Sequence, residues 1–372
     1  MTTLMAILGI VILFIILWDG FEVIILPRRV ARKIRLSRLY YLSTWAVCSW
    51  YARHIRNPRR RERYLSFYGP LSLVFLIAFW AAGMMVGFAM VQWSVGPPGI
   101  RFKESLYLSG TTFITLGMGV PHTFWSRLVV IIEAGVGFGF LALVISYLPV
   151  LYQSFARRET NILLLDARAG SPPTAAEMLR RYAGGHGMPA MDELLREWEI
   201  WAADLLETYI SYPVLAYFRS QHDNQSWLAA LTAILDVCAV IIAGIDNLAP
   251  WQARLTFAMA RHTVVDLAQI VNAPPRQPPA DRLPAGVLAQ FKQHLISEGI
   301  AVTNAAEFDI KLAKMRRLYE PYVFALSERF ILTPATWMPD GRHIDNWRTS
   351  AWERSAGGLP PSLFDGQDDV HT

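Results

Sequence analysis

The chain contains few of the groups from which disulfide frameworks, metal centres or nucleotide sites are built. It has only two cysteines in 372 residues, Cys48 and Cys238, and their spacing matches no metal-binding motif. It has no Gly-x-Gly-x-x-Gly segment after a strand-like run and no phosphate-binding loop. No nucleophile-base pair stands out either, so we expect neither an enzyme nor a resident cofactor. Both cysteines are expected to be small, buried or half-buried side chains.

Long apolar runs are what the chain has instead. Hydrophobic residues make up 53% of it, and its mean hydropathy is +0.28. Residues 4–26, 71–93 and 124–152 are each long enough to cross a bilayer, which takes about 20 residues. Met1 to Thr3 carry no side-chain charge, and no small-residue cleavage site follows, so residues 1–26 are expected to remain as a membrane helix rather than act as a signal peptide.

Basic residues are concentrated between the first two runs. Residues 27–63 hold twelve arginines and lysines and one acid, Glu62, for a net charge of +11, whereas the whole chain carries +5. A basic run beside a membrane span is retained on the cytoplasmic side, so we read this segment as cytoplasmic rather than as a nucleic-acid site. The N-terminus then lies outside and the C-terminal part inside, in the plasma membrane of a bacterium. Both cysteines would be cytoplasmic, where a disulfide is not expected.

A short segment rich in threonine and glycine separates the second and third runs. Residues 111–119 read Thr-Thr-Phe-Ile-Thr-Leu-Gly-Met-Gly. An ion filter replaces the water around an ion with successive backbone carbonyls, and Gly117 and Gly119 permit the φ > 0 geometry that such a stack requires. Residues 103–114 can form a helix too short to cross the bilayer, with its C-terminal dipole aimed at an ion. The alternative is a Gly/Thr-rich turn between two membrane helices.

The order of residues through this region resembles that of a known family. Thr112-x-x-Thr115-x-Gly117-x-Gly119, followed by Pro121, Arg127, Glu133 and Gly137, is similar to the pore module of the potassium channel family with a re-entrant pore loop. The resemblance covers residues 71–152. It implies a homotetramer in which each chain supplies one quarter of the filter, with K⁺ as the permeant ion. The residues that it implies are Thr115, Leu116, Gly117, Met118 and Gly119 in the filter, with Thr111 and Thr112 as support from the pore helix.

Two residues depart from the family pattern, Thr-Val-Gly-Tyr-Gly-Asp. Met118 replaces the aromatic residue with a flexible thioether. Val120 replaces the acid, which removes a charge and an acceptor from the outer mouth. We therefore expect weak to moderate selectivity for potassium over sodium. A non-selective cation channel, or a membrane sensor or scaffold that no longer conducts, is the alternative.

The third run contains further candidates. Gly135, Gly137 and Gly139 can act as a gating hinge, or as small residues can allow close helix packing. Glu133 is an ionisable group inside a span, which makes it a functional candidate, and it can hydrogen-bond behind the filter.

Acids also occur near the inner end of the first run. Asp19 and Glu22 are functional candidates for the same reason. Arg28 and Arg29 follow closely enough to pair with them. A structural role is therefore at least an equal alternative.

Within the basic segment, residues 36–51 mix aromatic and aliphatic residues with arginines at both ends. A helix here can lie in the headgroup layer or pack on the cytosolic part of the chain. In the first case the partner is anionic lipid, bound through residues 28–63.

The rest of the chain reads as an all-α cytosolic domain, residues 154–345, for assembly or gating, followed by a disordered tail, residues 346–372. Residues 227–245 have the length of a span, but Asp236 at the centre favours a buried helix. His262 with Asp266, and the cluster His222-Asp223-Asn224, are weak candidates for a divalent ion, in spacings that match no zinc or calcium loop. The helical patterns lie at residues 174–184, 189–211, 224–245, 251–271, 285–298 and 305–330.

The sequence therefore predicts an all-α membrane protein. It would have three transmembrane helices, one re-entrant pore helix with a filter, and an all-α cytosolic domain. The expected parts are an N-terminal helix (1–26), a basic segment (27–66), a pore module (67–153), the cytosolic domain and the tail.

Overall fold

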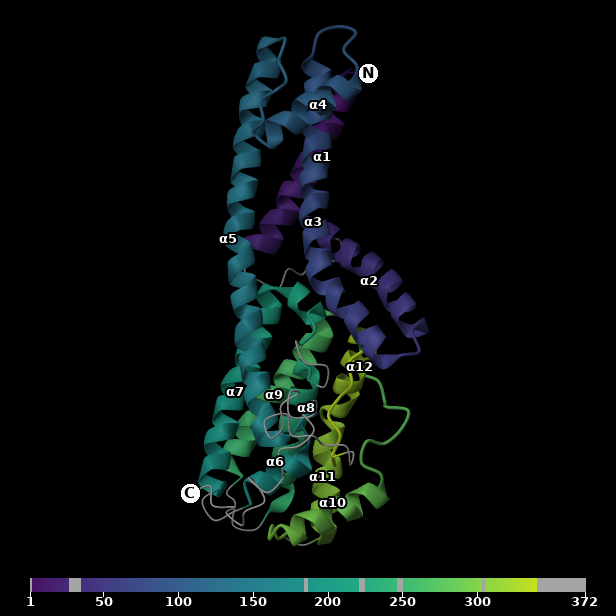
Figure 1. Ribbon diagram of the computed structural model, residues 1–372, viewed down its shortest axis with the longest axis vertical. Helices are drawn as coiled ribbons and strands as arrows, with labels where there is room; N and C mark the ends of the chain where they lie inside the picture. Colours follow the sequence, from purple (N-terminus) through teal and green to yellow (C-terminus); the bar gives the residue numbers. More distant parts are fainter. Residues whose placement is uncertain are drawn as a thin grey trace, which may run out of the picture. The chain divides into compact units, whose positions relative to one another are not determined.

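The computed structural model describes residues 2–26, 35–183, 187–220, 225–245, 250–302 and 305–339. These residues form helices, with two isolated bridges, Thr174 to Thr336 and Ile245 to Val302, and no longer strand pairing among them. The all-α prediction is therefore confirmed (Figure 1). The predicted tail, residues 346–372, lies outside the described residues.

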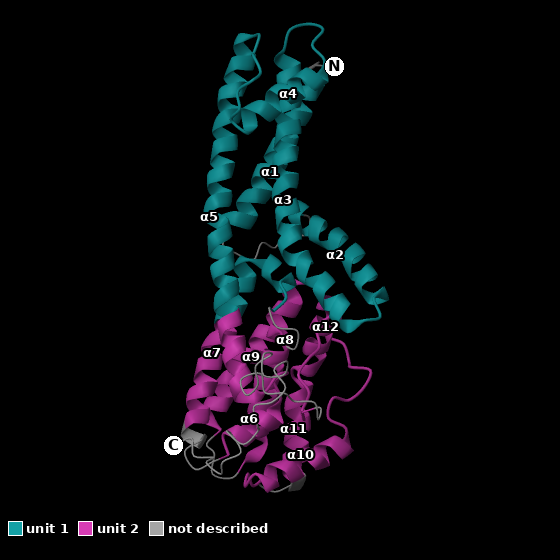
Figure 2. Cartoon of the chain, in the orientation of Figure 1, with its two compact units in different colours: residues 1–158, 204–223 teal, residues 159–203, 224–372 magenta. Residues whose placement is uncertain are grey.

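The chain divides into two compact units (Figure 2). Unit 1 consists of residues 1–158 and 204–223, and unit 2 of residues 159–203 and 224–372. Unit 1 contains α1 (Thr2–Ile24), α2 (Leu36–His54), α3 (Pro58–Val95), α4 (Phe102–Phe113), most of α5 (Phe124–Ala169) and the 3₁₀ helix η1 (Pro213–Tyr217). Unit 2 contains α6 (Ala175–Arg181), α8 (Trp227–Gly244), α9 (Trp251–Ile270), α10 (Ala285–Ser297), α11 (Ala305–Arg317), α12 (Glu320–Phe330) and the first part of α7 (Gly187–Ser211).

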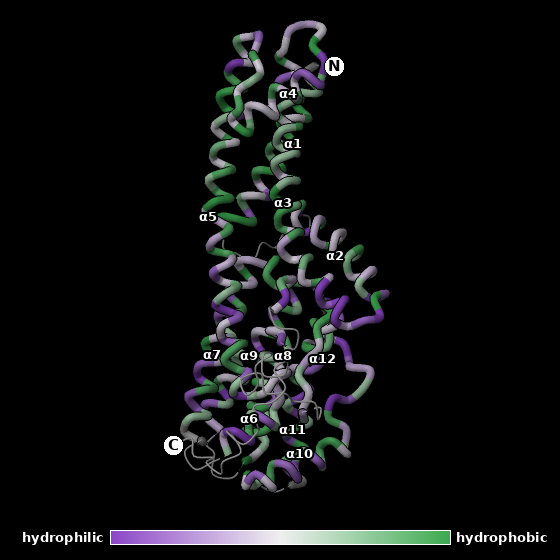
Figure 3. Tube along the Cα trace, viewed as in Figure 1, coloured by the Kyte–Doolittle hydropathy of each residue, from purple (hydrophilic) through white to green (hydrophobic). Residues whose placement is uncertain are grey.

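Four helices have the length and composition of a membrane span: α1, α3, α5 and α8. These helices differ in how much of their apolar stretch is buried inside the protein. The buried share is 22%, 33% and 11% for α1, α3 and α5, but 89% for α8. A helix that faces lipid leaves most of its apolar residues unburied, as the first three do; Figure 3 shows the hydropathy of the residues along each helix. Helix α8 instead forms part of the core of unit 2, in agreement with the buried helix that Asp236 favoured.

Helix α1 packs along α3 through small residues. An added Cβ at Gly9 would lie 2.6 Å from the carbonyl oxygen of Gly87, so the two backbones touch at this level. Below this contact, Leu13 and Ile16 of α1 share a buried cluster with α3 and α4. Other members of the cluster are Leu76, Trp80, Met84, Phe88 and Phe113.

Two helices are longer than the membrane runs predicted for them. Helix α3 begins at Pro58, where Asn57 accepts hydrogen bonds from the amides of Arg59 and Arg60 at 3.0 and 3.3 Å. A capping side chain followed by proline at the first helical position is a strong start signal. Helix α5 likewise continues past the apolar run to Ala169. The boundaries drawn at residues 66 and 153 thus fall inside helices, because a change in polarity marks a membrane surface and not a helix end.

Helix α2 packs on the rest of unit 1 by one face. The hydroxyl of Tyr40 donates to the carbonyl of Ser72 at 2.9 Å, and Thr44 is 2.9 Å from the hydroxyl of Tyr68. The opposite face carries exposed apolar side chains, at Leu39, Leu42, Val47, Trp50 and Tyr51.

In unit 2, the predicted helix 305–330 is two helices. Helix α11 ends at Arg317 and α12 begins at Glu320, with Pro321 in its first turn. Proline inside a helix removes a hydrogen bond and clashes with the preceding turn, but it is tolerated near an N-terminus. Proline therefore forces a new start at this point. The other predicted helices are present, including α6 with Thr174 as its N-cap.

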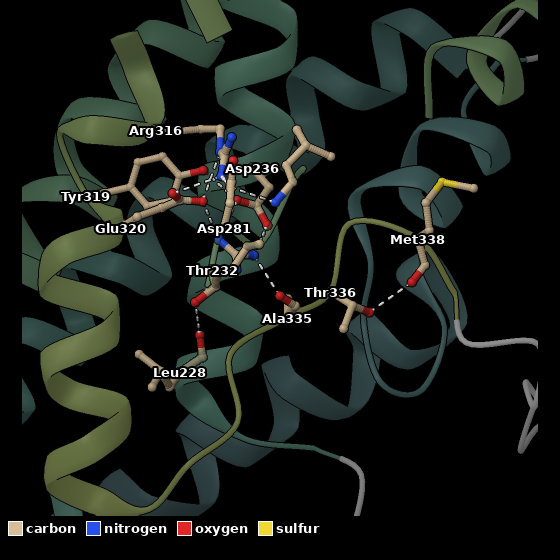
Figure 4. Close-up of polar contacts among 12 residues, drawn as sticks. Leu228, Thr232, Asp236, Asp281, Arg316, Tyr319, Glu320, Ala335, Thr336 and Met338 are labelled. Carbon is tan, nitrogen blue, oxygen red and sulfur yellow. Dashed lines mark hydrogen bonds and ion pairs between the residues drawn. The ribbon is translucent and has the colours of Figure 1, made fainter. Parts of the chain in front are cut away.

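A buried ion-pair network explains how Asp236 sits within the apolar helix α8 (Figure 4). Arg282 donates to Asp236 at 2.6 Å, to Glu320 at 3.1 Å and to the carbonyl of Ala335 at 2.6 Å. Arg316 pairs with Glu320 at 3.0 Å. The charges are thus matched by hydrogen bonds, as a buried carboxylate requires.

The weak metal candidates find no support. His262 lies 3.5 Å from Asp266 on α9, and within the described ranges no group of three or more His, Cys, Asp or Glu side chains could hold an ion. Residues 222–224 lie outside the described residues. Both cysteines are free and buried.

Candidate functional site

The predicted pore helix is α4, Phe102–Phe113, which agrees with the prediction of residues 103–114. Its buried side includes Ser105, Leu108 and Ser109. The helix ends with Thr111, Thr112 and Phe113, all buried. At 12 residues it is too short to cross a bilayer. Its C-terminal carbonyls, the negative end of the helix dipole, lead directly into the candidate filter.

The pore helix holds the filter segment through backbone hydrogen bonds. The amide of Thr115 donates to the carbonyl of Thr112 at 2.9 Å. The amides of Leu116 and Gly117 both donate to the carbonyl of Thr111, at 2.8 and 3.0 Å. Thr111 and Thr112 thus hold residues 115–117 through their carbonyls, a contact that depends on their position at the helix end rather than on their hydroxyls.

The carbonyl oxygens of this segment are left available. Within the described part of the chain, no group donates a hydrogen bond to a carbonyl of residues 114–119. Backbone carbonyls are strong acceptors and require a partner from water, an ion or another chain. The amides of residues 114–117 are therefore bonded to the pore helix, and the carbonyls of residues 114–119 have no protein donor within the described ranges.

Two glycines and a threonine set the backbone of the filter, in roles that differ from the expectation. Gly117 has φ of +64°, as predicted, and Thr115 has φ of +60°. Gly119 is not in the left-handed region. A Cβ at Gly119 would instead lie 2.5 Å from Cδ1 and 3.1 Å from Cα of Leu108. Gly119 is therefore required for space, since it lets the end of the filter lie against the pore helix.

Met118 has a partner that sequence reasoning missed. The hydroxyl of Tyr107, one turn and a half before the end of α4, donates to the sulfur of Met118 at 4.0 Å. The thioether is a weak acceptor. Leu116, Met118 and Val120 are otherwise exposed apolar side chains in the single chain.

Glu133 is buried against the back of the pore helix. Its carboxyl contacts the hydroxyl of Ser109 on α4, and this hydroxyl is also 2.7 Å from the carbonyl of Met85 on α3. A serine hydroxyl has one proton, so Ser109 donates either to the carboxylate of Glu133 or to the carbonyl of Met85 at any one time. Glu133 thus joins α5 to α4; its place behind a filter stays a prediction.

A second polar pair ties α3 to α5 nearby. The side chains of Gln92 and Ser126 exchange hydrogen bonds, with Ser126 donating to Gln92 at 2.7 Å and Gln92 donating to the carbonyl of Ser126 at 3.3 Å. Neither residue was singled out from the sequence, because isolated polar residues near the ends of apolar runs are common.

The three glycines of α5 are not equivalent. A Cβ at Gly137 would lie far inside van der Waals contact of the carbonyl oxygen of Phe113, and 3.0 Å from its carbon. At Gly135 and Gly139 nothing lies within 4 Å. Close packing, one of the two predicted roles, therefore applies to Gly137. The other two retain the hinge interpretation.

The acids of α1 have structural partners. Asp19 is buried and accepts from the amide and hydroxyl of Ser37 at 3.1 and 3.0 Å, and from the indole of Trp80 at 3.0 Å. It therefore ties the start of α2 to α1 and α3. Glu22 accepts from Trp18 at 2.7 Å and pairs with Arg35 at 3.3 Å. Arg28 and Arg29, the expected partners, lie outside the described residues.

The comparisons with known proteins bear on the same region. Residues 73–153 match a family model described as an ion channel, and these residues run from early in α3 through the pore helix and filter segment into α5. No curated protein and no solved structure matches the chain. The match spans less than a quarter of the chain, and it coincides with the part that holds the free carbonyls. The match therefore supports an ion channel pore module at residues 73–153 of a membrane protein.

Proposed function

We propose that the protein is a homotetrameric channel that conducts potassium passively through the carbonyls of residues 115–119. The observation that carries this proposal is the one-sided hydrogen bonding of the segment. The amides of Thr115, Leu116 and Gly117 are held by the pore helix, and no carbonyl of the segment has a partner in the described chain. Four such segments around an axis would give the rings of carbonyls that replace the hydration shell of K⁺.

The exposed side chains of the segment support assembly. Leu116, Met118 and Val120 are apolar and more than half exposed in one chain. Side chains of this kind at a filter need cover from a neighbouring copy, since exposed apolar groups clustered at one place mark interaction sites. A single pore loop per chain is consistent with four copies.

Selectivity is proposed to be weak to moderate. Met118 rests on the hydroxyl of Tyr107 through a contact at 4.0 Å, which is weaker than the packing of a rigid ring. A filter held in this way can adapt to more than one ion radius. Potassium permeability is therefore proposed with limited discrimination against sodium.

The proposed orientation in a bacterial plasma membrane places residues 27–63 in the cytoplasm. Anionic lipid is the proposed partner of this segment. The outward face of α2, with Leu39, Val47 and Trp50 exposed, suits a helix that lies in the headgroup layer. Unit 2 is proposed to be cytosolic and to assemble or gate the pore.

Current through purified protein in planar bilayers tests the proposal. Wild type should carry potassium current that shrinks when sodium replaces potassium. Gly117→Ala should abolish it, because a Cβ disfavours φ of +64° at the filter. Gly99→Ala is the matched control, since Gly99 also has positive φ, +87°, with nothing within 4 Å, but lies in the outer loop.

If the Gly117→Ala variant carries the same current as wild type, residues 115–119 are not the filter. A wild type that carries no current, although it forms tetramers, would instead favour a sensor or scaffold that has lost conduction.

A further inference from the structure

A short stretch of chain far from the pore module in sequence belongs to the pore unit. Residues 204–223 are part of unit 1, whereas the residues on either side of them, 159–203 and 224–372, form unit 2 (Figure 2). The stretch contains the end of α7, the 3₁₀ helix η1 and Phe218. We name residues 209–218 the inner brace. The chain therefore leads from both ends of this stretch into unit 2.

One side of the inner brace holds the inner part of α5 through a buried arginine. Arg158 is 3% exposed. Its guanidinium donates to the hydroxyl of Tyr209 at 2.6 Å and to the carbonyls of Leu215 and Phe218, both at 3.1 Å. The planar, always charged guanidinium can hold several acceptors in a fixed geometry, which a lysine cannot do. These three bonds fix the brace to α5.

Aromatic contacts extend this attachment along α5. Tyr147 lies against Tyr212 with ring centroids 5.7 Å apart, and Phe155 lies against Phe218 at 5.6 Å. With Arg158, the attachment therefore covers about three turns of the helix.

The other side of the inner brace contacts α2 and α3. The ring of Tyr217 lies 5.0 Å from Trp45, 5.4 Å from Tyr68 and, stacked at 11°, 5.7 Å from Tyr41. Phe218 lies against Gly69, where a Cβ would be 2.7 Å from its ring. The brace thus fills the space between the inner parts of α3 and α5.

We propose that the inner brace couples the state of unit 2 to the pore, by fixing the separation of α3 and α5 on the side away from the filter. This inference rests on the proposed channel function. Helix α5 follows the proposed filter directly in the chain, so a shift of its inner part acts on the helix that leads out of the filter. Because the brace is tied covalently to unit 2 at both ends, a rearrangement there moves Arg158 and Tyr217 together.

The packing energies favour a brace that moves as a unit. A buried arginine that loses its acceptors is left as an uncompensated charge, so Arg158 keeps its bonds when the brace shifts. The aromatic contacts also resist separation, because packed ring pairs stabilise beyond the apolar area that they bury. A segment that only filled space would need neither three acceptors for Arg158 nor a glycine opposite Phe218.

Single-channel recording of the full-length protein tests the coupling, with one variant on each side of the brace. Tyr209→Phe removes one acceptor of Arg158 and keeps the ring. Gly69→Ala adds a methyl group on α3 that would lie 2.7 Å from the ring of Phe218 and so displaces this ring. Each should change the open probability by at least about fivefold, the lower range of measured allosteric couplings. Unitary conductance and the potassium-to-sodium ratio should stay at wild-type values, since neither residue touches the filter.

The matched control is Arg157→Ala. Arg157 neighbours Arg158 and pairs with Asp204 at 2.8 Å, but its side chain is 60% exposed, and exposed pairs contribute little. Its open probability should stay within about twofold of wild type. The double variant Tyr209→Phe with Gly69→Ala should be non-additive, because both residues act on one element. Wild-type open probability in both single variants would overturn the inference while leaving the channel function intact.

Hydrogen exchange on the same variants separates the two proposals. If wild type does not conduct, the channel function fails, and exchange alone decides on the coupling. Gly69→Ala should then alter amide exchange in residues 187–203, the part of α7 in unit 2, as well as in residues 213–218. A change confined to residues 65–69 and 213–218 would show a local packing contact and overturn the coupling.

Discussion

The contact between Gly137 and the end of the pore helix gives the sharpest prediction on packing. A Cβ at Gly137 would overlap the carbonyl oxygen of Phe113 and lie 3.0 and 3.1 Å from its carbon and Cα. These are backbone atoms, so no side chain can rotate out of the way. Gly137→Ala must therefore push α5 away from α4, at a cost of roughly 1–3 kcal/mol as for other overpacked sites.

The neighbouring glycines provide matched controls on the same helix. Gly135→Ala and Gly139→Ala meet nothing within 4 Å, and alanine improves helix propensity by about 1 kcal/mol over glycine. Gly139 also lines an apolar cavity of about 230 Å³ between α1, α3 and α5, which has room for a methyl group. We expect both variants to be at least as heat-stable as wild type.

Thermal unfolding of the purified protein in detergent and single-channel recording together measure the effect. Gly137→Ala should lower the midpoint of thermal unfolding and alter conduction, since the displaced carbonyl of Phe113 directly precedes the filter. Equal tolerance of alanine at all three positions would refute the close contact. Equal loss of gating at all three would favour a hinge over packing.

Three further predictions test other parts of the structure. Glu133→Gln should conduct like wild type, because glutamine keeps the size of the side chain and an oxygen that can accept from the hydroxyl of Ser109, whereas Glu133→Ala should lose heat stability by about 1–3 kcal/mol; a harmless alanine in thermal unfolding would contradict this. Met118→Tyr with Val120→Asp should raise the potassium-to-sodium permeability ratio, and a wild-type reversal potential already at the potassium limit would show that these residues do not loosen the filter. Asp236→Ala removes one of the two buried carboxylates that Arg282 contacts, a loss of roughly 1–3 kcal/mol that should lower the unfolding midpoint by about 5 °C, and most of it should return when Arg282→Met is added with Asp236→Leu.

The sequence predicted the local elements of the site well. Apolar runs of span length, a 12-residue helix before the filter and a glycine at φ of +64° all follow from short-range rules. The match to an ion channel at residues 73–153 falls within the predicted pore module. Glu133 was also placed behind the filter, because a charge in an apolar run needs a polar partner.

What the sequence did not predict depends on contacts between distant residues. The role of Gly119 comes from Leu108, and the partner of Met118 is Tyr107. Tertiary contacts of this kind have no local signature. The inner brace could not be predicted either, since it joins Arg158 to residues more than 50 positions away.

The ends of two helices do not coincide with the ends of their apolar runs. Helices α3 and α5 continue beyond their apolar runs, to lengths of 38 and 46 residues. Arginine and glutamate are good helix formers, so the charged flanks extend the helices instead of ending them. In the predicted helix 305–330, the single proline Pro321 was the break signal that the apolar pattern obscured.

The most direct test of the central claim is to locate the ion. A structure of the full-length protein determined in Tl⁺ or Rb⁺ should show a fourfold assembly, with ion density on its axis between carbonyl oxygens of residues 115–118. These heavier ions substitute for K⁺ and are visible against carbon and oxygen. An assembly without fourfold symmetry, or a symmetric one with no ion density beside these carbonyls, would contradict the assignment of residues 115–119 as a potassium-permeable filter.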